Sequence, residues 1–112
     1  MTFGIIGSGA FGTALSISLS STNEKLILWT RNQDVVNSVQ EIRENRLRLP
    51  GYILPQNIIV TNDINQMENC SIILIAVPMQ QLRSVVELHR SRLEGKILCL
   101  LYTSDAADEG LG

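Results

Sequence analysis

Five runs of apolar residues recur along the chain, and segments of a different character separate them. The runs are TFGIIG (2–7), KLILWT (25–30), NIIVT (57–61), SIILIAV (71–77) and KILCLL (96–101). Each run is continuously apolar instead of alternating, which is typical of strands covered by helices on both faces. Strands that alternate with helical patterns indicate βαβ units. We therefore predict an α/β fold built on a doubly wound parallel sheet.

The segments between the runs predict helices and one long loop. Residues 10–20 are small and apolar, as expected of a helix packed closely on a sheet, and residues 80–90 predict another helix. Residues 32–47 carry four apolar side chains at helical spacing, which are Val35, Val36, Val39 and Ile42. The stretch RLPGYILPQN (48–57) is broken by proline and glycine and predicts a loop. Asp63 is suited to cap a short helical turn that ends at Met67.

Three glycines lie at the end of the first run and directly after it. In GIIGSGAFGTAL (4–15), Gly7, Gly9 and Gly12 have the G-x-G-x-x-G spacing. Gly7 permits a tight turn, Gly9 lets a pyrophosphate approach the backbone, and Gly12 lets helix and strand pack closely. The phosphates would lie at the helix N-terminus, where unpaired N–H groups and the helix dipole favour an anion. The strand before and the helix after the motif favour a Rossmann-type dinucleotide site over a purely structural turn.

The residues after the second run bear on the choice of dinucleotide. An NAD-type site has Asp or Glu there to bind the ribose 2′-hydroxyl, whereas this chain reads LWTRN (28–32). Arg31 stands in place of the carboxylate, and a guanidinium pairs well with a 2′-phosphate. NADP(H) is therefore favoured and NAD(H) stays open, with a merely solvated Arg31 as the alternative. Asn32 either bonds the same phosphate or caps the next helix.

Two more positions fall close to the predicted site. Phe11, between the second and third glycines, faces either the cofactor or the sheet, and the spacing does not decide between them. Val77 and Pro78 lie at the carboxyl end of the fourth run, where open parallel sheets bind ligands. Pro78 either borders the cofactor or only ends the strand.

Four stretches together resemble the N-terminal domain of NAD(P)-dependent glycerol-3-phosphate dehydrogenases. They are GSGAFGTAL (7–15), LWTRN (28–32), ENRLRLPGYILPQNIIVTND (44–63) and ILIAVPMQQLR (73–83). The glycine motif is shared by many dehydrogenases, but the E-N-x-x-x-L-P-G segment is far more specific.

The resemblance implies a function and a set of contacts. The family transfers hydride between NAD(P)H and dihydroxyacetone phosphate, which gives sn-glycerol 3-phosphate for phospholipid synthesis. By motif, the resemblance places Ala10, Phe11, Arg31 and Asn32 on cofactor-contacting positions. Arg48 stands where many members have a tyrosine, so this chain departs from the family there.

Candidates for catalysis are scarce. Reduction of a carbonyl needs a donor or cation near the developing alkoxide, and a phosphorylated substrate needs a cationic anchor. His89 is distant in sequence from every ligand-facing strand end, and Lys25 and Lys96 open strands at the opposite end of the sheet. The resemblance implies that the family's lysines for this chemistry lie after the fifth strand and in a C-terminal helical domain. We therefore assign no catalytic residue and no metal ligand, and predict that this chain alone is inactive.

The last segment departs from the resemblance. The stretch CLLYTSDAADE (99–109) resembles one reading frame of a transposase adapter used in preparing DNA sequencing libraries. We therefore predict a truncated dinucleotide-binding domain over residues 1–98 and a non-native tail over residues 99–112. A genuine fifth strand followed by an acidic tail is the alternative.

The sequence leaves two other functions open. One is a stand-alone nucleotide-binding module without catalysis, and the other is a fragment of a related hydroxy-acid reductase.

Composition narrows the class of protein further. A chain of 112 residues can bury one core. Three of the eleven acidic residues lie in the last ten positions, so residues 1–98 are close to neutral and show no sign of a nucleic-acid partner. No apolar run reaches the roughly 20 residues of a membrane span, and no secretory signal is visible. We expect a cytoplasmic protein with Cys70 and Cys99 buried and reduced; a homodimer of the complete enzyme stays open.

Overall fold

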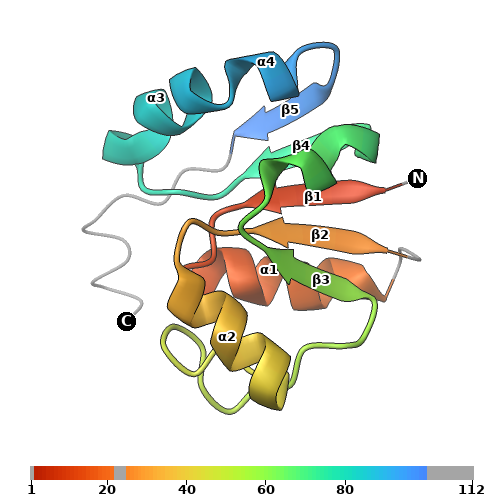
Figure 1. Ribbon diagram of the computed structural model, residues 1–112, viewed down its shortest axis with the longest axis vertical. Helices are drawn as coiled ribbons and strands as arrows, with labels where there is room; N and C mark the ends of the chain where they lie inside the picture. The colour runs from red at the N-terminus through yellow and green to blue at the C-terminus, as the bar shows by residue number, and fades with distance from the viewer. Residues whose placement is uncertain (1, 22–24, 101–112) are drawn as a thin grey trace.

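The five apolar runs form one parallel sheet. The computed structural model describes residues 2–21 and 25–100. The strands are β1 (Phe3–Ile6), β2 (Leu26–Trp29), β3 (Ile58–Thr61), β4 (Ile72–Ile75) and β5 (Ile97–Leu100), in the order β3-β2-β1-β4-β5 (Figure 1). The chain moves outward from β1 in one direction to β2 and β3, then crosses β1 to β4 and β5. This confirms the predicted doubly wound parallel sheet, and each strand falls within its predicted run.

Helices cover both faces of the sheet. The helices α1 (Ala10–Ser20) and α2 (Gln33–Ile42) pack on one face, where Ile5, Leu28, Val35 and Val39 share a buried cluster (Figure 1). The other face is covered by the 3₁₀ helix η1 (Ile64–Asn69) and by α3 (Met79–Leu88) and α4 (Arg90–Leu93). Its cluster includes Ile6, Ile27, Met67, Ile73, Val85 and Leu93. Neighbouring strand residues such as Ile5 and Ile6 therefore enter different cores, as the period of two in a strand requires.

Local signals set the helix ends. The side chain of Asn32 accepts a hydrogen bond from the Asp34 amide and caps α2, and the side chain of Asp63 accepts from the Asn65 amide and caps η1. The cap by Asp63 was predicted, and the cap by Asn32 was one of two alternatives left by the sequence. The helical pattern of residues 32–47 ends early, because Arg43 has a left-handed backbone with φ 56°. Its guanidinium donates to the carbonyl oxygens of three residues ahead of and within β3, which are Leu54, Pro55 and Ile58.

The prediction for the fifth strand was wrong in one respect. All strands were expected to be buried on both faces, yet each residue of β5 is exposed, and Ile97 retains 63% of its accessible surface. β5 lies at one edge of the sheet and none of its residues belongs to either buried cluster, whereas Ile58 and Val60 of β3, at the other edge, pack in the cluster under α1 and α2. Cys99 on β5 is accordingly exposed, against expectation, whereas Cys70 is buried; both thiols are free. The predicted boundary at residue 98 falls inside β5, and residues 101–112 lie outside the described residues.

Candidate functional site: a cleft at the carboxyl ends of the strands

A cleft of about 820 Å³ opens where β1, β2 and β4 end. Its walls come from four segments, the glycine loop after β1, the residues that close β2, the loop after α2, and the start of α3. The cleft lies at the crossover between the two halves of the sheet, where open parallel sheets bind ligands. All eight residues predicted to contact a cofactor line it, namely Gly7, Gly9, Ala10, Phe11, Gly12, Arg31, Asn32 and Pro78.

The protein's own packing requires two of the three glycines. Gly7 has φ 118°, and a Cβ atom there would lie 2.3 Å from the carbonyl oxygen of Ala76. A Cβ atom on Gly12 would lie 2.0 Å from the carbonyl oxygen of Gly7. Any larger residue at either position displaces backbone atoms. These two glycines therefore shape the turn from β1 into α1 and let the helix approach the sheet.

Gly9 differs, because nothing in the described structure fills the space beside it. A Cβ atom on Gly9 would have no neighbour within 4 Å, and its backbone (φ −66°, ψ −177°) is one that any residue adopts. Gly9 is the N-cap of α1 and borders the cleft. The first turn of α1 has no acidic residue, in contrast to α2, whose first turn contains Asp34. The N-terminus of α1 thus presents bare backbone to the cleft, which suits a phosphate group.

The charged residues of the cleft are both positive. Arg31 follows β2 and Arg48 lies in the loop after α2, and the residues that line the cleft include no Asp or Glu. The chain as a whole has a net charge of −2, so this concentration of positive charge is local. Two guanidinium groups beside a helix N-terminus favour a ligand with several phosphates.

The structure decides between the two alternatives for Phe11, whereas Asn32 and Pro78 are each the N-cap residue of a helix and also line the cleft. Phe11 is 43% exposed and borders the cleft, so it faces the ligand side and not the sheet. The Asn32 side-chain oxygen caps α2, as one alternative held, while the residue also lines the cleft. Pro78 is both the N-cap residue of α3 and part of the cleft wall.

Sequence reasoning missed the pair formed by Trp29 and His89. Trp29 lines the cleft, and its ring meets the His89 imidazole edge-on, with 4.5 Å between centroids and 76° between planes. Both residues are buried, and neither Trp29 Nε1 nor His89 Nε2 has a hydrogen-bond partner within the described part of the chain. Burial lowers the pKa of His89, and the positive charge of Arg31 lowers it further. Separation in sequence hid this contact, because Trp29 ends β2 whereas His89 lies at the junction of α3 and α4.

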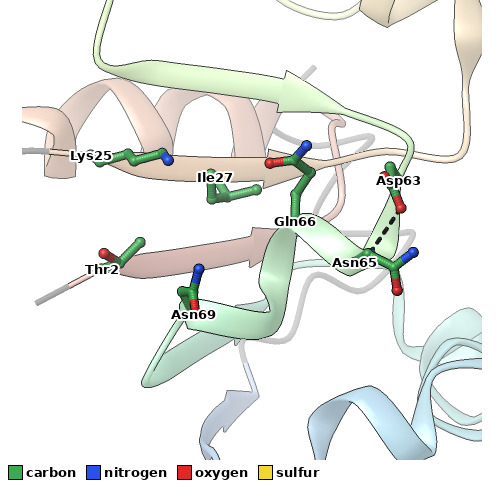
Figure 2. Close-up of a pocket in the computed structure, with 7 residues that line it drawn as sticks. All are labelled: Thr2, Lys25, Ile27, Asp63, Asn65, Gln66 and Asn69. Carbon is green, nitrogen blue, oxygen red and sulfur yellow. Dashed lines mark hydrogen bonds between the residues drawn. The ribbon is translucent and has the colours of Figure 1, made fainter.

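A second, smaller hollow of about 310 Å³ lies elsewhere on the molecule. Figure 2 shows its lining side chains, which are Thr2, Lys25, Ile27, Asp63, Asn65, Gln66 and Asn69. Thr2 and Lys25 precede β1 and β2, so this hollow begins at the amino ends of the strands. The dashed line in Figure 2 is the cap of η1 by Asp63. The cleft at the carboxyl ends is thus the better candidate for a ligand site.

The fold and the cleft define a dinucleotide-binding domain of the Rossmann type. A model of the family described as NAD-dependent glycerol-3-phosphate dehydrogenase N-terminus matches residues 2–103. The chain belongs to this family. Within the described residues, no helix is both long and apolar enough to cross a membrane.

Comparison with individual proteins agrees with the family. The chain is 41% identical over 112 residues to glycerol-3-phosphate dehydrogenase [NAD(P)+] of Ruegeria sp. (strain TM1040). This match covers 100% of the chain and 35% of the relative. It is 42% identical over 109 residues to the enzyme of the same name from Syntrophomonas wolfei, with 96% and 32% coverage. The crystal structure of glycerol-3-phosphate dehydrogenase from Coxiella burnetii superposes with a TM-score of 0.80 at 26% identity, over 94% of this chain and 34% of that one.

The chain therefore spans about a third of the length of the curated relatives that it matches. The resemblance inferred from the motifs is confirmed, and the family match decides against the hydroxy-acid reductase alternative.

Proposed function

We propose that the cleft binds NADP(H), with the chain serving as the cofactor-binding domain of a glycerol-3-phosphate dehydrogenase. The observation that carries this proposal concerns Gly9, the N-cap residue of α1. The packing of the protein does not require a glycine there, yet the position has no side chain. The pyrophosphate would lie against Gly9, Ala10 and Phe11, with Gly7 and Gly12 shaping the loop. Pro78 would border the cofactor from the β4 side.

The preference for NADP(H) over NAD(H) rests on the residues after β2. Arg31 is exposed at the cleft, and among the cleft's lining residues there is no carboxylate to accept from a ribose 2′-hydroxyl. A guanidinium at this place favours a 2′-phosphate. Asn32 adds a side-chain amide beside it, because its cap of α2 engages the carbonyl oxygen alone.

For the complete protein, the family suggests reduction of dihydroxyacetone phosphate to sn-glycerol 3-phosphate, with the nicotinamide supplying the hydride. This chain's own residues would bind and orient the cofactor. The groups that anchor and protonate the substrate would come from outside residues 1–98, and homodimer formation by the complete enzyme belongs to the same proposal.

The test uses Trp29, the single tryptophan of the chain, which lines the cleft. Reduced nicotinamide absorbs in the range of tryptophan emission, so binding quenches the fluorescence and gives a Kd for NADPH and for NADH. Arg31→Asp should weaken NADPH binding by roughly 10- to 150-fold, as expected for loss of a charge-assisted pair of about 1.5–3 kcal/mol. NADH binding should change little.

Arg83→Asp on α3 is the matched control, because it makes the same change in charge at an exposed residue that does not line the cleft. An equal loss of NADPH and NADH affinity in the Arg31 variant would refute the role in reading the 2′-phosphate. Absence of quenching by either cofactor in the wild-type chain would refute cofactor binding itself.

A further inference from the structure

The E-N-x-x-x-L-P-G segment folds into a closed loop beside the glycine motif. Glu44 pairs with Ile53 in an antiparallel bridge, and its carboxylate accepts a hydrogen bond from the Gly51 amide at 3.0 Å. The carbonyl of Arg43 accepts from the Leu54 amide at 2.7 Å. The base of the loop is therefore held shut, and its outer part supplies Leu47, Arg48 and Leu49 to the wall of the cleft.

Asn45 joins this loop to the glycine motif. Its side chain is fully buried, and its Nδ2 donates to the Ser8 carbonyl oxygen and to Thr13 Oγ1, both at 2.9 Å. Its Oδ1 accepts from the Arg48 amide at 3.3 Å, so both ends of the side-chain amide are used. Thr13 Oγ1 in turn donates to the same Ser8 carbonyl at 3.2 Å. A buried amide with its bonding capacity engaged in this way fixes the groups that it touches.

The bond to the Ser8 carbonyl sets the orientation of the peptide between Ser8 and Gly9. The described chain has no cis peptide bond, and in a planar trans peptide the N–H points opposite to the C=O. Because the Ser8 carbonyl points to Asn45, the Gly9 N–H points away from Asn45, and Gly9 itself borders the cleft. The Ser8 hydroxyl supports the same orientation by donating to Thr30 Oγ1 at 2.6 Å.

We propose that Asn45 is a positioning residue for the dinucleotide pyrophosphate, which it serves by holding the Ser8–Gly9 peptide with its N–H toward the cleft and Arg48 at the cleft wall. This inference rests on the proposed function. Asn45 does not reach the ligand. It acts through a backbone donor and a cation that face the part of the cofactor shared by NADPH and NADH.

Substitution of Asn45 should have an effect on ligand affinity that differs from the effect of substituting Arg31 and from that of a general loss of stability. Asn45→Ala should raise the Kd for NADPH and for NADH by a similar factor, about tenfold for the loss of one charge-assisted backbone contact. Binding of 2′-AMP, which carries the adenosine and the 2′-phosphate but no pyrophosphate, should not change. Affinities come from Trp29 quenching for the reduced cofactors and from calorimetry for 2′-AMP, at a temperature where thermal unfolding shows each variant to be folded.

Asn57→Ala is the matched control, because Asn57 Nδ2 donates to the carbonyl of Ser20 at 2.7 Å and so anchors α1 at its other end. This control should lose stability but keep both cofactor affinities. If Asn45→Ala does not fold, Thr13→Val removes the hydroxyl that bridges Asn45 and Ser8, and should weaken both cofactors several-fold with 2′-AMP binding unchanged.

The outcomes are distinguishable. Equal losses for NADPH, NADH and 2′-AMP, or unchanged affinity for both reduced cofactors, would overturn the role of Asn45 while leaving cofactor binding in place. A wild-type chain that binds 2′-AMP but neither dinucleotide would overturn both this inference and the proposed function.

Discussion

At the scale of single residues, the shape of the cleft depends on the three glycines of the motif, which have no side chain. Gly7 and Gly12 face backbone oxygens at distances that no Cβ atom tolerates, whereas Gly9 faces open space. Three glycines in one motif thus answer to two different demands. Gly7 and Gly12 are needed for the chain to fold, whereas the packing does not require Gly9, in agreement with the proposed approach of a pyrophosphate.

Exchange of each glycine for alanine separates these demands. Gly9→Ala should change the free energy of unfolding by about 1 kcal/mol or less, the usual effect at a helix N-cap, yet weaken NADPH binding by crowding the pyrophosphate. Gly12→Ala should lower the free energy of unfolding by about 3 kcal/mol or more, because the new methyl group overlaps the Gly7 carbonyl. Urea unfolding and cofactor titration of both variants measure this. A Gly9 variant with native cofactor affinity would contradict the assignment.

At the scale of elements, the junction of α3 and α4 brings an ionisable ring into the core beside β2. His89 ends α3, precedes α4 and packs against Trp29. Since burial and the Arg31 charge lower its pKa, the folded chain disfavours the imidazolium ion, whereas the unfolded chain does not.

The free energy of unfolding should therefore depend on pH below the ordinary pKa of histidine. Above about pH 6.5 the ring is neutral in both states and costs nothing; as the pH falls toward the lowered pKa of the folded state, the unfolded state binds the proton more readily and stability is lost. His89→Phe keeps an aromatic edge against Trp29 and should flatten this part of the profile. Urea unfolding between pH 5 and 7.5 provides the measurement. A profile unchanged by the substitution would mean that His89 does not cause it.

The elements also show how far sequence reasoning reaches. The apolar runs placed every strand, and local signals that act within a few residues gave the Asp63 cap and offered the Asn32 cap as one of two alternatives. The motif spacing placed eight residues at one cleft, since they follow strand ends that a parallel sheet must bring together. Contacts made between distant segments gave no such signal. The anchoring of Ser8 by Asn45 and the edge-on contact of His89 with Trp29 join segments that lie far apart in the sequence.

At the scale of the whole molecule, one edge of the sheet is open. Every residue of β5 is exposed, including Ile97, Leu98 and Leu100, and an apolar edge strand is a template for pairing with another chain.

Ile97→Lys should reduce self-association of this chain at high concentration, because a charged side chain disfavours pairing of two edges. The free energy of unfolding should stay within about 0.5 kcal/mol of wild type, since Ile97 is already mostly exposed. Ile73→Lys, at a fully buried position of the neighbouring β4, is the contrasting variant and should not fold. Sedimentation velocity over a range of concentrations measures the self-association of each variant. Association that persists in the Ile97 variant would mean that the contact between chains lies away from β5.

The central position of β1 has a consequence for the time at which this domain becomes competent. Phe3 pairs with Ile72, the Gly7 turn lies against Ala76, and the Ser8 carbonyl accepts its hydrogen bond from Asn45. During synthesis β1 is thus completed only when β4 has emerged from the ribosome, and contacts so far apart in sequence form slowly. The glycine loop after β1 is completed by residues that are made later, so the cleft takes its final shape only after β4 has joined the sheet.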